Sequence, residues 1–297
     1  MRINAGPTDM GRVGVWTWPL VTAPAPHIRQ AVRAIEDMGY GAVWFPESRG
    51  REAIALSAML LAETSTIKVA PGIANIWARD ASAAAGAAMA LGEAWPGRFT
   101  LGLGVSHAPA VGVRGHEYVR PLARMREYLD AMESAVFVGP EPETPVPVVL
   151  AALGPKMLRL AVEKAAGAHP YFVPVSHTAF ARETMGPDGF LAPEQAVVLD
   201  TDPERARATA RGHMERYLLL DNYRRNLLRL GWGESDLDNG GSDEVVDAVV
   251  AWGSAEAITE TIAAHHEAGA DHVSIQVISE SEGVPLAELE ELARHLL

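Results

Sequence analysis

Cysteine is absent from this 297-residue chain. Without thiols there can be no disulfide framework, no thiolate nucleophile and no thiolate metal site. Three further patterns are missing: the Gly-x-Ser-x-Gly elbow of hydrolases, the phosphate loop ending in Gly-Lys-Ser/Thr, and the His-Glu-x-x-His metal helix. We therefore expect no metal site, and we expect a bound cofactor to supply the difficult chemistry.

Positive charge is also scarce. The 25 Lys and Arg residues face 38 Asp and Glu residues, which gives a formal net charge of −13. This balance argues against nucleic acid and anionic membranes as partners. No apolar run approaches the roughly 20 residues of a membrane-spanning helix, and residues 1–10 do not resemble a signal peptide. We expect a cytoplasmic protein that acts on a small-molecule substrate.

The sequence does contain a regular alternation of short apolar runs and amphipathic helical stretches. Parallel strand pairs need long crossovers, so this alternation predicts a parallel α/β sheet. Eight such units predict closure into a (β/α)8 TIM barrel that comprises residues 1–297 as a single domain. An open, doubly wound sheet is the alternative, but no glycine-rich dinucleotide fingerprint follows the first strand. The expected strands are 13–16, 42–45, 67–73, 99–105, 146–151, 171–173, 195–199 and 272–277.

Two segments, 105–122 and 201–251, interrupt this alternation and are expected to be insertions. The second carries two helical stretches, 203–220 and 222–230, followed by an acidic loop at 231–243. Long excursions from a compact domain are usually functional lids or oligomer contacts.

Candidate site residues follow from the rule that barrel chemistry sits on the loops after the strands. Glu47 follows the second strand, where a carboxylate either orients a ligand, relays a proton or ties down its own loop. His107 follows the fourth strand and either moves a proton near neutral pH or is structural. The run 152–156 places glycine and proline at a helix start, where free N–H groups attract anions; an ordinary strand-to-helix turn is the other interpretation.

Aromatic and histidine side chains add a second group of candidates. Tryptophans near strand ends either form walls for a flat ligand or belong to the core. The histidines of the late helix are expected to face solvent. These residues are Trp16, Trp18, Trp44 and Trp77, and His265 and His266.

Several motifs together resemble the bacterial luciferase-like superfamily. Residues 98–106 (RFTLGLGVS) resemble its fourth-strand signature, and residues 37–47 (DMGYGAVWFPE) resemble its second strand unit. Residues 67–79 and 151–157 resemble its third strand and its fifth-strand turn. Residues 191–199 (LAPEQAVVL) resemble a segment of a subgroup assigned to F420-dependent oxidoreductases. The order and spacing of these motifs extend over nearly the whole chain.

The resemblance implies a flavin or the deazaflavin coenzyme F420, held at the carboxyl end of the barrel. It places Glu47 near the cofactor, His107 near the reacting ring and Gly154 at a cofactor phosphate. It also implies a non-proline cis peptide at Gly72–Ile73 that presses on the ring, and pairing of two chains into a homodimer. The predicted catalytic residues are His107 and Glu47, and the predicted cofactor contacts are Trp16, Glu47, Gly72, Ile73, Asn75, Ser106, Leu153, Gly154, Pro155 and Lys156.

Three functions are compatible with these residues. The first is an F420-dependent oxidoreductase that transfers a hydride between the deazaflavin and a small organic substrate. The second is an FMN-dependent monooxygenase on the same fold. The third is a non-catalytic protein that binds flavin or F420; proton carriers such as His107 and Glu47 argue against it.

Overall fold

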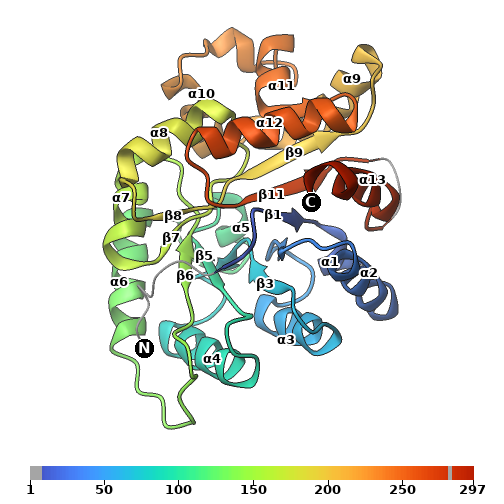
Figure 1. The fold of residues 1–297 in the computed structure, drawn as a ribbon. Helices are drawn as coiled ribbons and strands as arrows, with labels where there is room; N and C mark the ends of the chain where they lie inside the picture. Colours follow the sequence, from blue (N-terminus) through green and yellow to red (C-terminus); the bar gives the residue numbers. More distant parts are fainter. Residues whose placement is uncertain (1–8, 280–282) are drawn as a thin grey trace.

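The computed structural model describes residues 9–279 and 283–297. Its strands form two parallel sheets, with the strand orders β10-β9-β11-β1-β2-β3 and β4-β5-β6-β7-β8 (Figure 1). The strands are β1 Val13–Trp16, β2 Ala42–Phe45, β3 Lys68–Pro71, β4 Ala74–Asn75, β5 Leu101–Gly104, β6 Val148–Leu150, β7 Gly167–Ala168, β8 Phe190–Leu191, β9 Glu194–Val198, β10 Val250–Trp252 and β11 Val273–Val277.

The two sheets form one barrel because two barrel strands are each divided between them. β3 continues into β4 across Gly72 and Ile73, and β8 continues into β9 across Ala192 and Pro193. Proline has no N–H to donate to a ladder, which accounts for the second break. Counting β3 with β4 and β8 with β9, the described residues give nine strands. Eight of them form the ring of the predicted (β/α)8 barrel, which closes through the pairing of β9 with β11, and the ninth, β10, is added beside β9.

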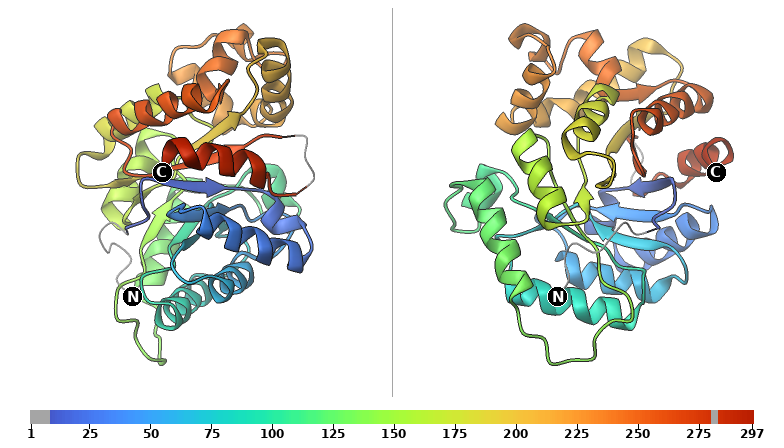
Figure 2. Two further views of the ribbon diagram at one scale, coloured as in Figure 1. Left: turned by 45° about the vertical axis from the view of Figure 1, so that its right-hand side comes forward. Right: turned by 60° about the vertical axis from the view of Figure 1, so that its left-hand side comes forward.

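Helices cover the outside of this barrel (Figures 1 and 2). Most strands are followed by a helix that packs its apolar face on the sheet, and the resulting core lies between the helices and the strands. The helices are α1 Pro19–Thr22, α2 Ala25–Asp37, α3 Ala53–Glu63, α4 Ala81–Ala94, α5 Ala108–Gly112, α6 Pro121–Glu133, α7 Pro155–Lys164, α8 Val175–Met185, α9 Pro203–Leu218, α10 Asp221–Arg229, η1 Glu234–Leu237, α11 Asp243–Val249, α12 Ala255–Glu267 and α13 Leu286–Leu296.

A smaller core fills the inside of the barrel. Trp16 and Trp44 are both buried there, and the Trp44 ring stacks on the His169 ring with 4.3 Å between centroids. Large aromatic side chains therefore fill the interior below the carboxyl ends of the strands, and a ligand has to bind above them.

One strand prediction is wrong in position. The sixth strand is β7, Gly167–Ala168, and not 171–173; Phe172 has a φ of +59° and its N–H donates to Glu194 Oε2 instead of to a neighbouring strand. A two-residue strand of glycine and alanine carries no apolar run of its own, so the sequence pattern favours the apolar run that follows it. The seventh strand, predicted at 195–199, is β9, and the short strand β8 precedes it.

The second insertion is more ordered than expected. The helices at 203–220 and 222–230 are confirmed as α9 and α10, but the segment also contains η1, α11 and the start of β10. β10 pairs in parallel with β9, with Val250 opposite Ala196. Helices α9, α10 and α11 form a group at one side of the barrel (Figures 1 and 2).

The chain offers no membrane span among its described helices: none is both long enough and apolar enough. In the same residues there is no cluster of His, Asp or Glu side chains suited to holding a metal ion.

Candidate functional site

A cavity of about 770 Å³ opens at the carboxyl ends of the barrel strands. Its walls come from the loops after β1, β2, β3, β5, β6 and β7, and from α9 and α10 of the second insertion. Residues from the first insertion, Tyr118 among them, close another part of the wall. Both insertions therefore contribute to the site, as their length predicts.

Ten of the residues predicted to form the site line this cavity, and one does not. Asn75 lies in β4 and is buried behind the wall, because its side-chain oxygen accepts from Trp77 N at 3.0 Å and its own N–H donates to Glu47. The residues that line the cavity are Trp16, Glu47, Gly72, Ile73, Ser106, His107, Leu153, Gly154, Pro155 and Lys156.

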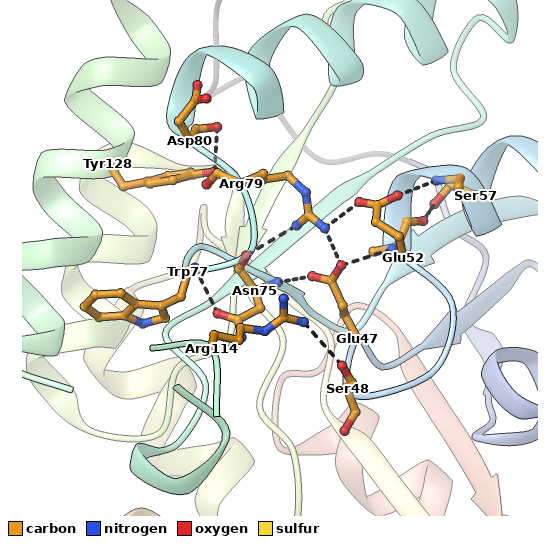
Figure 3. Close-up of polar contacts among 12 residues, drawn as sticks. Glu47, Ser48, Glu52, Ser57, Asn75, Trp77, Arg79, Asp80, Arg114 and Tyr128 are labelled. Carbon is orange, nitrogen blue, oxygen red and sulfur yellow. Dashed lines mark hydrogen bonds and ion pairs between the residues drawn. The ribbon is translucent and has the colours of Figure 1, made fainter. Parts of the chain in front are cut away.

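Glu47 is the centre of a buried hydrogen-bond network (Figure 3). Its Oε2 accepts from Asn75 N at 2.7 Å, and its Oε1 accepts from Ala53 N at 3.1 Å and from the Arg79 guanidinium. The Glu47 side chain is 2% exposed and that of Arg79 is 9% exposed. Burial alone would lower the pKa of Arg79, but its hydrogen bonds and ion pairs with Glu47 and Glu52 raise it. The network ties the loop after β2 to β4 and to the start of α3.

The Gly72–Ile73 peptide bond is cis, as predicted. Trp16 Nε1 donates to Gly72 O at 3.2 Å. A Cβ atom on Gly72 would stand 2.8 Å from both Trp16 Nε1 and His169 Nε2, so only glycine fits between these two rings. The small residue Gly104 serves a similar purpose, because the Ile73 side chain occupies the space above it.

His107 is held by a residue of the second insertion. Its Nδ1 lies 3.0 Å from Asn222 Oδ1, and its ring lies 5.4 Å from the Tyr223 ring. An amide oxygen can only accept, so Nδ1 carries the proton and Nε2 keeps its lone pair. Burial lowers the pKa of His107, and the hydrogen bond to Asn222 opposes this. The imidazole is therefore neutral at pH 7 and can accept a proton.

The start of α7 gathers positive charge. Gly154 is its N-cap and makes no side-chain cap, and Pro155 occupies the first turn. Lys156 lines the cavity in that first turn, and the Arg229 guanidinium lies close above Gly154. Free N–H groups and two cations make this end of the cavity suited to a phosphate.

Comparison with known proteins identifies the family. The model of the luciferase-like monooxygenase family matches residues 10–272. The chain belongs to the luciferase-like monooxygenase family.

Two relatives of this luciferase-like chain have names that assign them to the oxidoreductases or reductases. The chain is 32% identical over 180 residues to a Mycobacterium tuberculosis protein, and the alignment covers 50% of this chain and 52% of that protein. The name of that protein assigns it provisionally to the coenzyme F420-dependent oxidoreductases. The chain is 28% identical over 150 residues to the 5,10-methylenetetrahydromethanopterin reductase of Archaeoglobus fulgidus, covering 44% and 45% of the two chains. The chain thus spans about half the length of the curated relatives it matches.

Solved structures share the luciferase-like fold over almost the full length. An F420-dependent secondary alcohol dehydrogenase, solved with an F420-acetone adduct, superposes with a TM-score of 0.77 and 15% identity over 96% of this chain and 98% of that one. The oxygenating constituent of the Pseudomonas putida 3,6-diketocamphane monooxygenase, solved with FMN, gives 0.69 and 18% over 96% and 98%. At these identities the likeness shows the TIM-barrel fold alone.

The cavity of this luciferase-like chain is also lined by residues that the sequence did not single out. Tyr171 OH donates to Gln276 Oε1 at 2.8 Å and lies 2.7 Å from Tyr217 OH, which lines the cavity from α9. Of the four tryptophans considered, Trp16 and Trp18 line the cavity. The length of the second insertion was the only sequence feature that indicated its residues would line the cavity. The lining residues in this group are His169, Tyr171, Arg216, Tyr217, Asn222, Tyr223 and Arg229.

The late-helix histidine His265 is fully buried, contrary to expectation. Its Nδ1 contacts Thr178 Oγ1 at 2.7 Å and its Nε2 contacts Gln195 Oε1 at 2.7 Å. It joins α12 to α8 and β9 and lies outside the cavity.

Proposed function

We propose that the chain is an F420-dependent oxidoreductase that transfers a hydride between the deazaflavin and a small organic substrate. The observation that carries the proposal is the cavity, whose cationic end at α7 and aromatic walls suit a phosphate-bearing, ring-shaped cofactor. The name of the Mycobacterium tuberculosis relative supports the choice of F420.

The residues present fit such a group. Lys156, Arg229 and the N-terminus of α7 would hold its phosphate, and Gly72, Ile73 and Trp16 would lie against its ring. When bound, F420 supplies the carbon that gives or takes the hydride. The protein then has to position the second reactant and move one proton.

His107 is the residue that we assign to the proton. Its Nε2 is unprotonated because Asn222 accepts from Nδ1, and its lowered pKa keeps the ring neutral near pH 7. Such a group accepts a proton as an alcohol is oxidised and returns it in the reverse direction. Glu47 receives a different role, because its carboxylate already accepts from three donors. We assign it to positioning the loop after β2.

A fluorescence titration of the purified protein with F420 and with FMN tests the cofactor. We expect F420 to bind at least tenfold more tightly. Equal affinities, or tighter binding of FMN, would overturn the proposal and favour the second candidate, an FMN-dependent monooxygenase like the FMN-bound structural neighbour.

Replacement of His107 tests the proton carrier. On any substrate that the wild type turns over with F420, His107→Ala should lower kcat by roughly 10²-fold, while the F420 dissociation constant changes less than kcat does. His116→Ala is the matched control, since His116 packs beside Trp77 outside the cavity lining. Equal kcat for His107→Ala and the control would remove His107 from the mechanism.

We also propose that the protein is a homodimer, on the basis of its family resemblance. Light scattering should then give about twice the 31.8 kDa mass of one chain. A mass equal to that of one chain across the accessible concentration range would contradict this proposal.

A further inference from the structure

The arginines of the second insertion fall into two groups. Helices α9 and α10 carry seven arginines, and five of them pair with carboxylates on the outside of the protein. Within the described residues, Arg216 and Arg229 have no carboxylate partner, and both line the cavity. The five paired arginines are Arg205, Arg207, Arg211, Arg224 and Arg225.

Arg216 is held by aromatic rings alone. Its guanidinium lies 5.6 Å from the centroid of the Trp18 ring and 4.9 Å from that of Tyr217, and none of the hydrogen bonds found among the described residues involves it. Stacking on aromatic faces leaves the N–H groups at the edge of the guanidinium free. Those N–H groups form a planar fork that matches a carboxylate.

The position of Arg216 separates it from the phosphate-binding end of the cavity. Trp18, on which it stacks, follows β1, whereas Lys156 and Gly154 follow β6. Counting β3 and β4 as one strand, β6 is the fifth strand of an eight-stranded barrel and lies opposite β1. A cofactor whose phosphate occupies the start of α7 therefore leaves Arg216 on the opposite side.

No described carboxylate pairs with Arg216. Glu47 is the one acidic residue among the described residues that line the cavity, and its carboxylate is already paired with Arg79. Arg216 also borders a second cavity whose wall includes Asp200 and Glu288, but Asp200 pairs with Arg205 and Glu288 accepts from Ser279. The chain as a whole carries a formal charge of −13, so an unpaired cation at this place is not part of a general positive surface.

We propose that the second reactant carries a carboxylate that Arg216 binds. The rest of that reactant is apolar or aromatic, because Trp18, on which Arg216 stacks, contacts Trp16, and Trp16 in turn contacts Tyr171, so that aromatic rings line the cavity from Arg216 onward. A single guanidinium suits a planar monoanion, whereas the start of α7 offers two cations and free N–H groups to a phosphate. The role of this compound as the hydride partner rests on the proposed function; the binding of its carboxylate does not.

Calorimetric titrations with matched acids and amides test the assignment. The probes are benzoate, cinnamate and 2-naphthoate, each compared with its neutral amide, and phenyl phosphate as a dianion. Each is titrated into the protein alone and into the protein saturated with F420. The variants are Arg216→Gln and Arg216→Lys, with Arg159→Gln as a control for an exposed arginine of α7 that lies outside the cavity lining.

We expect at least one acid to bind the wild type tenfold or more tightly than its amide. This preference should vanish in Arg216→Gln, persist in part in Arg216→Lys, stay intact in Arg159→Gln and weaken with added salt. No preference in any of the three pairs, or a preference that survives in Arg216→Gln, would overturn the proposal. Tighter binding of phenyl phosphate than of every acid would overturn the choice of a carboxylate.

Two further outcomes separate this inference from the proposed function. If Arg216→Gln weakens F420 binding tenfold and leaves the acid preference unchanged, the guanidinium belongs to the cofactor and the inference is wrong. If the wild type does not bind F420 at all, the proposed function fails, and the titrations of the protein alone still decide whether Arg216 binds carboxylates.

Discussion

Replacement of Glu47 by Gln separates a structural role from a chemical one. Gln keeps the shape of the side chain but removes its charge, and one of its two polar ends becomes a donor. The carboxylate now accepts from Asn75 N at 2.7 Å, from Ala53 N at 3.1 Å and from Arg79. An amide would turn its NH2 group toward at least one of these donors, and the Arg79 charge would lose its buried partner.

The size of the effect follows from the burial of the pair. Breaking a buried ion pair by removing one partner typically costs about 3–5 kcal/mol. Glu52 also contacts Arg79 and its side chain is 48% exposed, so the charge of Arg79 keeps partial compensation. We therefore expect a loss of about 2–3 kcal/mol in the free energy of unfolding. For a 297-residue chain, an unfolding entropy of about 2.1 cal/mol/K per residue converts this to a fall in Tm of about 3–5 °C.

Calorimetric melts at pH 7 measure this change. Glu163→Gln is the matched control, because Glu163 pairs with Arg126 on the surface, where both side chains are about half exposed, and should alter Tm little. Arg79→Met and the double variant complete a cycle that measures the coupling between the two side chains. A Tm for Glu47→Gln equal to that of the wild type, together with lost turnover, would refute the positioning role and restore Glu47 as a proton carrier.

Two further substitutions give expected outcomes of known direction. Gly72→Ala places a methyl group 2.8 Å from ring atoms of Trp16 and His169, so it should lower the free energy of unfolding by about 1–3 kcal/mol and weaken F420 binding. Gly86→Ala is the control: it lies in α4 with nothing within 4 Å of the added methyl group and should be neutral or stabilising. Equal melting temperatures for the two variants would show that the Trp16 and His169 rings move aside. Burial raises the pKa of Glu194 to about 8, although the N–H of Phe172 opposes this, so the folded state holds a proton there that the unfolded state releases near pH 4.5. The wild type should therefore lose stability relative to Glu194→Gln as pH rises from about 4.5 to about 8. Urea unfolding of both proteins at a series of pH values measures this change. A difference in unfolding free energy that stays constant over this range would show that Glu194 is ionised in the folded protein.

The sequence predicted the framework of the barrel well, because apolar runs and helix periods are local. β1 and β2 have the predicted bounds, and the other predicted strands, apart from the sixth, differ by a few residues. β7 was missed because its two small residues gain their burial from neighbouring strands and not from a run of their own.

The site was predictable only in the parts that directly follow strands. Glu47 and His107 were found in this way, but their partners Arg79 and Asn222 lie 32 and 115 residues further along the chain. Pairings over such distances are made by the closed barrel and leave no periodic signal. The same reasoning explains His265, whose helical position gave no indication that Gln195 and Thr178 would face it.

The pairing of β10 with β9 has a consequence for how this protein could be redesigned. The residues between Val198 and Val250 leave the barrel from one strand and return on the strand beside it, held by a fixed hydrogen-bond register. That excursion carries Arg216, Tyr217, Asn222 and Arg229, while the loops after the barrel strands and the first insertion carry the remaining walls. Its two ends are therefore natural junctions for exchanging the segment as one cassette, which would alter what the cavity accepts while leaving the ring of strands in place.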